Sequence, residues 1–252
     1  MSTSAKAPTR VGRLTVAVRA LYWPKACENN HKLPPDAVRA PPRISDSALR
    51  RLSYYLRFLE AFEAEGRATI SSEDLAERGG TTSAQVRKDL SHFGSFGKRG
   101  LGYPVTELRG RLADILGVGR RWEVALVGAG KLGAALYAYD GFRRRGFHVV
   151  AVFDADPRKI GKRWGQLEIE HVAALASSVT EKGIEIGILV TPADAAQEVA
   201  DAMVAAGITA ILNFAPRKLV LPETVTLRDV NLAIELEALC FSLSHPDWIV
   251  GR

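Results

Sequence analysis

The chain has 252 residues, of which 47% are hydrophobic and 25% are charged, and its formal net charge is +6. This length provides for one large domain or two modest ones, and we favour two. No apolar run approaches the roughly 18 residues of a membrane span, so the sequence argues against a membrane protein. The short apolar stretch near the amino terminus is interrupted by Arg19 and lacks a cleavage site, which argues against a secretory signal.

The two cysteines are far apart in the sequence, so they indicate neither a disulfide framework nor a metal site. Cys27 and Cys240 leave a thiol switch open, but we favour one thiol in a tail and an unrelated thiol buried in a helix. This cysteine usage predicts a protein of the reducing cytoplasm.

The positive charge of the chain comes from its first 43 residues. Residues 1–43 contain eight Lys or Arg, two Asp or Glu and six of the twelve prolines, so the net charge of the remainder is zero. This composition predicts a basic, Pro-rich and disordered tail. The tail either adds non-specific attraction to phosphates or is not translated, in which case a start at Val38 leaves a compact protein.

Residues 44–119 are predicted to form a DNA-binding domain that begins with a long amphipathic helix. Apolar residues follow one another at steps of three and four, and the pattern ends at Gly66. The side chains expected on the buried face are Ala48, Leu52, Tyr55, Leu56, Leu59 and Phe62.

Two shorter helices follow, joined by the turn Gly79-Gly80. Ser71 and Ser72 precede acidic residues, which favours a helix amino terminus there. Thr81 or Thr82 can cap the third helix, whose expected buried residues are Ala84, Val86 and Leu90. Three short helices with a tight turn describe a helix-turn-helix unit.

The segment after the third helix contains too much glycine to be helical. Four glycines fall between Gly94 and Tyr103, and with Val105 and a strand at Thr69-Ile70 this stretch predicts a small hairpin, the wing of a winged helix. A closing helix is expected within 107–118. The side chains predicted to face DNA are Gln85, Arg87 and Lys88 on the third helix and Lys98 and Arg99 at the wing tip.

Residues 120–230 alternate strands and helices, which predicts a doubly wound parallel sheet of Rossmann type. β-branched runs mark strands at 124–127, 149–153, 184–190, 210–214 and 225–227, with an alanine-rich helix over 194–206. A last helix over 232–244 places Leu232, Leu236, Leu239, Cys240 and Leu243 on one side. Such an end-helix often packs on a partner subunit.

A dinucleotide fingerprint follows the first of these strands. Residues 128–133 read GAGKLG, and Asp154 follows 21 residues later at the end of the next strand, where its carboxylate can accept from a ribose hydroxyl and would repel a 2′-phosphate. This favours NAD, although the basic runs 143–145 and 158–159 leave NADP open. The residues expected to bind the cofactor are Gly128, Ala129, Gly130, Lys131, Leu132, Gly133, Asp154, Thr191, Pro192, Asn213 and Phe214.

Catalytic residues and metal ligands are not expected. His148, His171 and His245 stand in no pairing that suggests acid-base or nucleophilic work, and no separate substrate domain is left. The dinucleotide is therefore expected to act as a regulatory ligand. Two alternatives are an NAD-dependent dehydrogenase with an accessory helical domain, and a CoA- or nucleotide-binding regulator without DNA contact.

The segments QVRKDLSHFGSFGKRGLGY, VGAGKLG, FDADP and ILNFAP resemble the bacterial redox-sensing transcriptional repressors of the Rex family. The likeness runs from about Ile44 to Trp248. It implies a homodimer with winged helices and NAD(H)-binding domains, in which the last helix, within 231–252, is swapped between subunits. Such a repressor binds operator DNA when NADH/NAD+ is low and dissociates when NADH binds.

The resemblance also implies three residues that couple the halves of the molecule. Arg57 in the first helix and Tyr139 after the glycine loop match the family, whereas Asn231 stands where the family has an aspartate. An asparagine can accept a hydrogen bond from Tyr139 but cannot form an ion pair with Arg57. The strength or direction of the NADH response is therefore open.

Overall fold

The computed structural model of the chain describes residues 44–97 and 100–246, all within the compact unit Ile44–Arg252. The predictions for the tail 1–43, with Cys27 and Val38, and for Lys98 and Arg99 lie outside the described residues.

The helix-turn-helix unit forms as the periodicity predicts. It consists of α1 (Asp46–Ala64), α2 (Ser72–Gly79) and α3 (Ser83–Ser91), and the six residues expected to be buried in α1 are buried. Ser71 caps α2 in a reciprocal capping box with Asp74, and Thr82 caps α3. The carboxyl end of α2 leads into Gly80 in the left-handed conformation, so the two glycines make the turn as expected.

The wing is shorter than the sequence suggests. β1 (Thr69–Ile70) pairs antiparallel with β2 (Tyr103–Pro104), which confirms that these two segments pair, but α2 and α3 lie between them in the chain, so the pair is not a hairpin. Val105 begins a helix instead of extending the strand. Pro104 provides the extended residue before α4 (Val105–Ile115), and Val105 is buried at its start. A proline fixes its own backbone and lacks an N–H group, so it ends the short ladder readily.

The buried side of α3 also differs from the prediction. Val86 and Leu90 are buried, but Ala84 is exposed and the carboxylate of Asp89 lies inside instead. Helical periodicity counts only apolar residues, so it does not reveal a buried charge.

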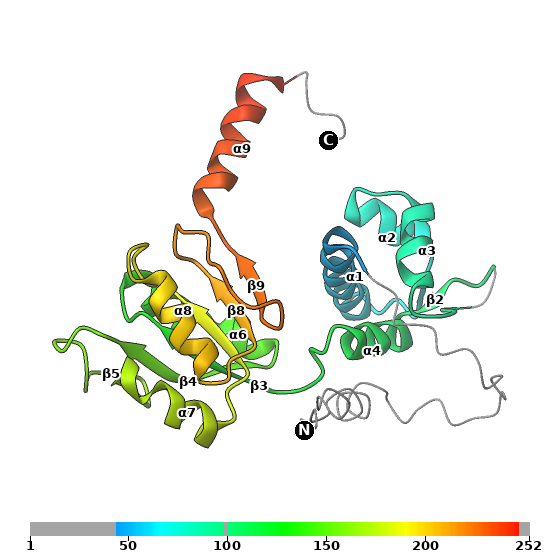
Figure 1. Cartoon of the computed structure of the whole chain (residues 1–252). Helices are drawn as coiled ribbons and strands as arrows, with labels where there is room; N and C mark the ends of the chain where they lie inside the picture. The colour runs from blue at the N-terminus through cyan, green and yellow to red at the C-terminus, as the bar shows by residue number, and fades with distance from the viewer. Residues whose placement is uncertain (1–43, 98–99, 247–252) are drawn as a thin grey trace, which may run out of the picture. The chain divides into compact units, whose positions relative to one another are not determined.

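The second part of the chain is a mostly parallel seven-stranded sheet in the order β5-β6-β4-β3-β7-β8-β9 (Figure 1). From β6 to β9 this is the strand order of a doubly wound dinucleotide-binding fold. The edge pair β5-β6 is antiparallel and was not predicted. The strands are β3 (Trp122–Val127), β4 (Phe147–Asp154), β5 (Arg163–Trp164), β6 (Leu167–His171), β7 (Ile186–Leu189), β8 (Ala210–Asn213) and β9 (Thr226–Asp229).

Helices cover both faces of this sheet. On one face Ala125 and Val127 pack in a core with residues of α7 (Leu175–Lys182) and α8 (Ala196–Ala205), whereas Leu126 between them belongs to a core on the other face. That alternation follows from the two-residue period of a strand. The second face carries α5 (Lys131–Tyr137), and the remaining short helices are α6 (Asp140–Arg144) and the 3₁₀ turn η3 (Val172–Ala174).

The last helix, α9 (Leu232–Ser244), buries none of its residues and extends from the end of β9 (Figure 1). Its exposed apolar side chains are not confined to the predicted side, because Ile234 and Phe241 are exposed as well. Cys240 is exposed too, which corrects the expectation of a buried thiol.

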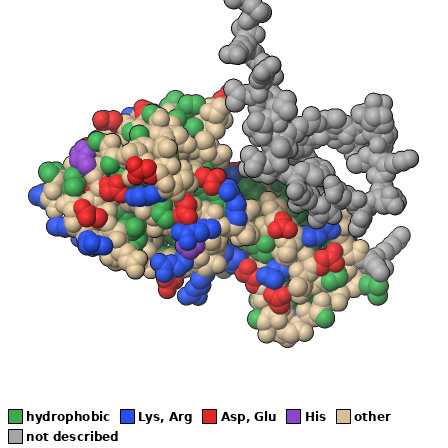
Figure 2. All heavy atoms as spheres, turned by 90° about the horizontal axis from the view of Figure 1, so that it is seen from below, with side chains coloured by type: hydrophobic (Ala, Val, Ile, Leu, Met, Phe, Trp, Pro, Cys, Tyr) green, Lys and Arg blue, Asp and Glu red, His purple; other side chains and the backbone are tan. Residues whose placement is uncertain are grey.

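Charges of both signs are interspersed on the face seen in Figure 2, in keeping with the zero net charge outside 1–43. Among the described residues, none of the helices combines the length and apolar character that a bilayer crossing needs. The same residues contain no cluster of three or more His, Cys, Asp or Glu suited to a metal ion.

Candidate functional site

The glycine loop lies at the carboxyl end of β3, between the two halves of the sheet. Gly128 has φ +114°, and a Cβ there would lie 2.4 Å from the carbonyl oxygen of Val190; a Cβ on Gly133 would lie 2.1 Å from the carbonyl oxygen of Gly128. Both positions therefore require glycine, the first for the turn and the second for close packing of α5 on the loop. The helix begins at Lys131, so Gly133 lies inside it.

A cavity of about 580 Å³ opens above this loop. It lies where the strand order reverses, which is the place where doubly wound sheets bind ligands. Eight of the eleven predicted cofactor residues line it: Gly128, Gly130, Lys131, Leu132, Asp154, Thr191, Pro192 and Phe214.

Asp154 ends β4 and is 8% exposed. One carboxylate oxygen accepts from the backbone N–H of Ala129 at 2.7 Å and from the Lys159 ammonium at 2.9 Å, and the other accepts from the N–H of Asp156 at 2.8 Å. Burial alone would raise the pKa of Asp154, but these donors hold it below its ordinary value. The side chain is therefore a charged acceptor at the rim of the cavity.

The other three predicted residues are not part of the cavity lining, but each is bonded to, packed on or adjacent to a residue that is. Ala129 donates to Asp154 and Gly133 packs on the loop. Asn213 is 1% exposed; its amide nitrogen donates to Asp229 and to the carbonyl of Arg217, and its oxygen accepts from the N–H of Ala215. Asn213 thus fixes the loop that carries Phe214.

Thr191 has a feature that fits a bound polar ligand. Its hydroxyl oxygen is buried in the cavity wall and finds no hydrogen-bond partner within the described part of the chain. Buried hydroxyl groups normally have a partner. A ligand in the cavity can supply it.

Lys159 was considered only as part of the run 158–159 that left NADP open, and it is not among the residues predicted to bind the cofactor. It lines the cavity and bonds Asp154, whereas its neighbour Arg158 pairs with Asp156 and is 86% exposed. Its spacing of five residues from Asp154 was the available signal. The run 143–145 ends α6 and precedes β4, whose eight residues separate it from the loop by roughly 25 Å, so it does not reach a 2′-phosphate there.

The predicted DNA residues of α3 differ in how they are held. The Gln85 amide donates to Asp89 at 2.7 Å, and Arg87 donates to the Ser72 hydroxyl at 2.8 Å and approaches Glu73 at 3.4 Å. Lys88 is exposed. Two of the three side chains are therefore oriented by hydrogen bonds to neighbouring side chains.

The three predicted coupling residues lie on or beside three different helices. Arg57 is exposed on α1, Tyr139 precedes α6 with 59% of its surface exposed, and Asn231 caps α9 by accepting from the N–H of Ala233. In the described part of the chain no hydrogen bond or ion pair joins the three. An aspartate would cap α9 in the same way as Asn231, so the change keeps the local structure.

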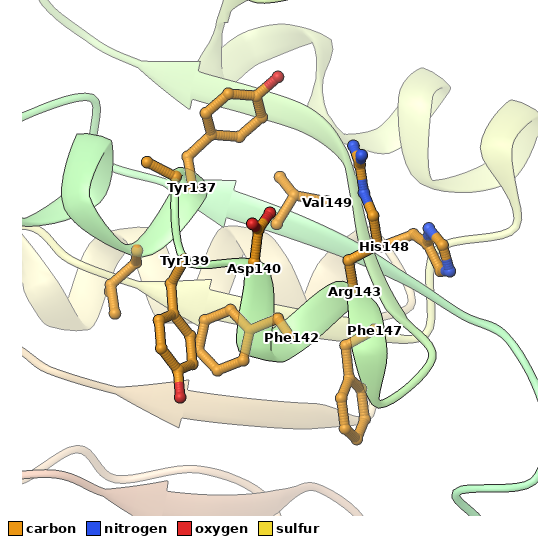
Figure 3. Close-up of a pocket in the computed structure, with 10 residues that line it drawn as sticks. Tyr137, Tyr139, Asp140, Phe142, Arg143, Phe147, His148 and Val149 are labelled. Atoms are coloured by element: carbon orange, nitrogen blue, oxygen red, sulfur yellow. The ribbon is translucent and has the colours of Figure 1, made fainter.

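Tyr139 lines a second cavity, of about 230 Å³, beside the amino end of β4 (Figure 3). Its ring meets that of Phe142 edge to face, with centroids 5.1 Å apart. The ring also lies so close to Gly141 that a Cβ there would be 2.3 Å from it. Figure 3 shows the Tyr139 hydroxyl and the Asp140 carboxylate pointing in opposite directions.

Comparison with known proteins agrees with both halves of this arrangement. Residues 43–91 match a family described as putative DNA-binding protein N-terminus, and residues 120–217 match the CoA binding domain family. The redox-sensing transcriptional repressor Rex of Syntrophomonas wolfei is 48% identical over 202 residues, which are 80% of this chain and 96% of that protein. The chain belongs to the Rex family. The Rex of Streptomyces coelicolor is 46% identical over 198 residues, which are 79% of this chain and 77% of that relative.

Solved structures give the same result. RSP, a Rex-family repressor, in complex with NAD+ and operator DNA is 38% identical to this chain with a TM-score of 0.78, over 82% of this chain and 95% of that one. RSP in complex with NADH is 36% identical with a TM-score of 0.74, over 82% and 97%. The Rex relatives are named repressors and not enzymes, which decides against the dehydrogenase alternative.

Proposed function

We propose that this chain is a redox-sensing transcriptional repressor that binds operator DNA when NADH/NAD+ is low and dissociates when NADH binds. The observation that carries the proposal is the likeness, over four fifths of the chain, to a repressor whose structure holds both NAD+ and operator DNA. The cavity at the glycine loop would hold NAD(H), and α3 with the wing would contact DNA. The protein would act in the cytoplasm.

The rim of the cavity supports NAD(H) over CoA and over NADP. CoA carries a phosphate on its adenosine ribose at the 3′ position and NADP at the 2′ position. Asp154 is a charged acceptor that suits free ribose hydroxyls and repels a phosphate. The Thr191 hydroxyl would gain the partner that it lacks among the described residues.

The proposed DNA contacts belong to two kinds. Gln85 and Arg87 lie near the start of α3, where side chains meet base edges in the major groove, and Lys88 would hold a phosphate. Lys98 and Arg99 would meet the backbone beside the groove. We assign these residues to a DNA-binding domain over 44–119, and 120–230 to the NAD(H)-binding domain.

A homodimer is part of the proposal, because α9 needs a cover. Six of its large apolar side chains are 47–80% exposed in the single chain. Contiguous exposed apolar surface of this kind marks an interaction site. We infer that α9, within 231–252, packs on a second copy of the chain.

Release of DNA would follow from differential affinity. NADH would bind best to an arrangement of the two subunits that misplaces their α3 helices, and NAD+ would not favour that arrangement to the same extent. We propose that Arg57, Tyr139 and Asn231 take part in this change. Because Asn231 cannot pair with Arg57 as an ion, its contribution would be a hydrogen bond alone.

The experiment is a titration of DNA binding with NADH at fixed NAD+. The probe is a duplex that the protein itself selects from a randomised pool, followed by fluorescence anisotropy. We expect affinity to fall as NADH rises and to be insensitive to CoA. Unchanged affinity over the whole titration would refute the sensor function, and saturable CoA binding by a protein that selects no DNA would support a nucleotide-binding regulator instead.

A further inference from the structure

Asp89 is a charged side chain on the buried side of the proposed recognition helix α3, with 1% of its surface exposed. A carboxylate in such a place is costly unless charged or polar partners surround it. Arg51 of α1 donates to both of its oxygens, at 2.6 and 2.8 Å, and the Tyr55 hydroxyl donates at 3.1 Å. The fourth hydrogen bond comes from the Gln85 side chain, one helical turn earlier, at 2.7 Å.

The partners keep Asp89 an obligate acceptor. Burial alone would raise the pKa of Asp89, but the hydrogen bonds from Arg51, Gln85 and Tyr55 hold it below its ordinary value. Burial and the nearby carboxylate raise the pKa of Tyr55 to about 12, so its hydroxyl keeps its proton. At neutral pH the Asp89 carboxylate therefore has no hydrogen to donate.

This property determines which end of the Gln85 amide faces Asp89. Only the amide nitrogen can donate to a carboxylate, so the amide oxygen cannot take that place. The bond uses one of the two hydrogens on the nitrogen. The oxygen and the second N–H of Gln85 remain available on the partly exposed side of α3.

That remaining pair matches one base edge. In the major groove adenine presents a donor on N6 and an acceptor on N7, and a glutamine that keeps its oxygen and one N–H together can pair with both. A reversed or freely rotating amide loses this preference. The orientation fixed by the buried carboxylate therefore bears on sequence specificity.

We propose that Asp89 is a specificity-determining positioning residue of the DNA interface, which orients the Gln85 amide for an adenine while itself touching no base. The inference rests on the proposed operator binding by α3. It assigns a role in reading sequence to a residue that is buried. Its alternative is a purely structural role, in which Asp89 only fastens α3 to α1.

The test compares base preferences of full-length variants. Wild-type protein selects a duplex from a randomised pool, and each A·T pair of the selected half-site is then replaced singly by G·C. In Asp89→Asn the side-chain amide can face Gln85 with either end, so we expect a loss of roughly tenfold discrimination at one position. The salt dependence of binding, which reports phosphate contacts, and the NADH affinity should stay as in wild type.

Three further variants separate positioning from folding. Gln85→Ala should lose adenine preference at the same position, and the double variant with Asp89→Asn should lose no more than that. Arg51→Lys weakens the attachment to α1 but keeps a cation beside the carboxylate, so it should lower the melting temperature and keep the base profile. If Asp89→Asn alone does not fold, the double variant Asp89→Asn with Arg51→Gln is measured in its place, because it also removes the Arg51 charge that has lost its partner.

Three results would overturn the inference alone: an Asp89→Asn base profile identical to wild type, an equal loss at every position in Asp89→Asn, or a Gln85→Ala profile identical to wild type. A wild-type protein that selects no sequence would instead overturn the DNA-binding function, and this inference with it.

Discussion

The Asp154 side chain accepts hydrogen bonds from its own surroundings and keeps one acceptor position for a ligand. Three donors hold it in place, and a carboxylate has about four acceptor positions, so one position remains for a ligand hydroxyl. The sequence located this residue by its spacing from the glycine loop. It did not assign Lys159 to the NAD(H) site, because a basic pair after a turn is ordinarily solvated. The sequence does not show that Lys159 pairs with Asp154 whereas Arg158 pairs with Asp156.

Replacement of Asp154 should weaken NAD(H) binding. In Asp154→Ala the ribose acceptor is lost, and we expect NADH affinity to fall about tenfold or more, as for other hydrogen bonds to charged groups. Isothermal titration calorimetry measures this, with Asp201→Ala, on the outer part of α8, as the matched control. Unchanged NADH affinity in Asp154→Ala would mean that the ribose is held elsewhere.

The cap of α2 shows how a short segment fixes the helix-turn-helix. The Ser71 hydroxyl accepts from the N–H of Asp74, and the Asp74 carboxylate accepts from the N–H of Ser71 at 2.7 Å. That backbone bond, with help from Arg67, lowers the pKa of Asp74 to about 2. The cap therefore sets where α2 begins, and with it the turn that presents α3.

Loss of the cap should be measurable and dependent on pH. Ser71→Ala should cost about 1 kcal/mol of unfolding free energy at pH 7. A carboxyl whose pKa is lowered by folding stabilises the protein above its ordinary pKa of 3.8, and this stabilisation is lost as the pH falls toward about 2. Thermal melts should therefore show a smaller loss of melting temperature at low pH for Asp74→Asn than for wild type. Glu77 is exposed on the same helix, so the control Glu77→Gln should behave as wild type.

Sequence patterns predicted the longer elements better than the short ones. The six buried positions of α1 repeat at helical spacing over about four turns, so they define a single buried face. The antiparallel pair β5-β6 has only two paired positions, Arg163 with Glu168 and Trp164 with Leu167. This pairing is too short for an alternation of apolar and polar residues to be recognised in the sequence. Ala84 was wrongly predicted to be buried, and the buried Asp89 was not predicted, because ion pairing between helices is a tertiary property.

At the scale of the whole molecule, the large apolar side chains of α9 are exposed in the single chain. The helical core and the two sheet cores each bury their own side chains, whereas α9 contributes none of its residues to them. The sequence predicted an apolar end-helix with one buried side. The exposed apolar side chains instead lie on more than one face of α9, and a helix of this kind is enclosed on several sides, which fits the proposed packing on a second subunit.

A charge in the middle of α9 should therefore separate the subunits. Leu239 is 59% exposed in the single chain, and burying a leucine contributes about 1.5–3 kcal/mol, so Leu239→Glu both removes that gain and places an unpaired carboxylate in the interface. We expect a shift from dimer toward monomer in sedimentation equilibrium, with Glu237→Gln on the same helix as the control.

Since a dimer reads two half-sites at once, operator affinity should fall in parallel with dimer content and recover at high protein concentration. A wild-type chain that sediments as a monomer, or a Leu239→Glu variant that stays dimeric, would show that α9 is covered by something other than a second copy.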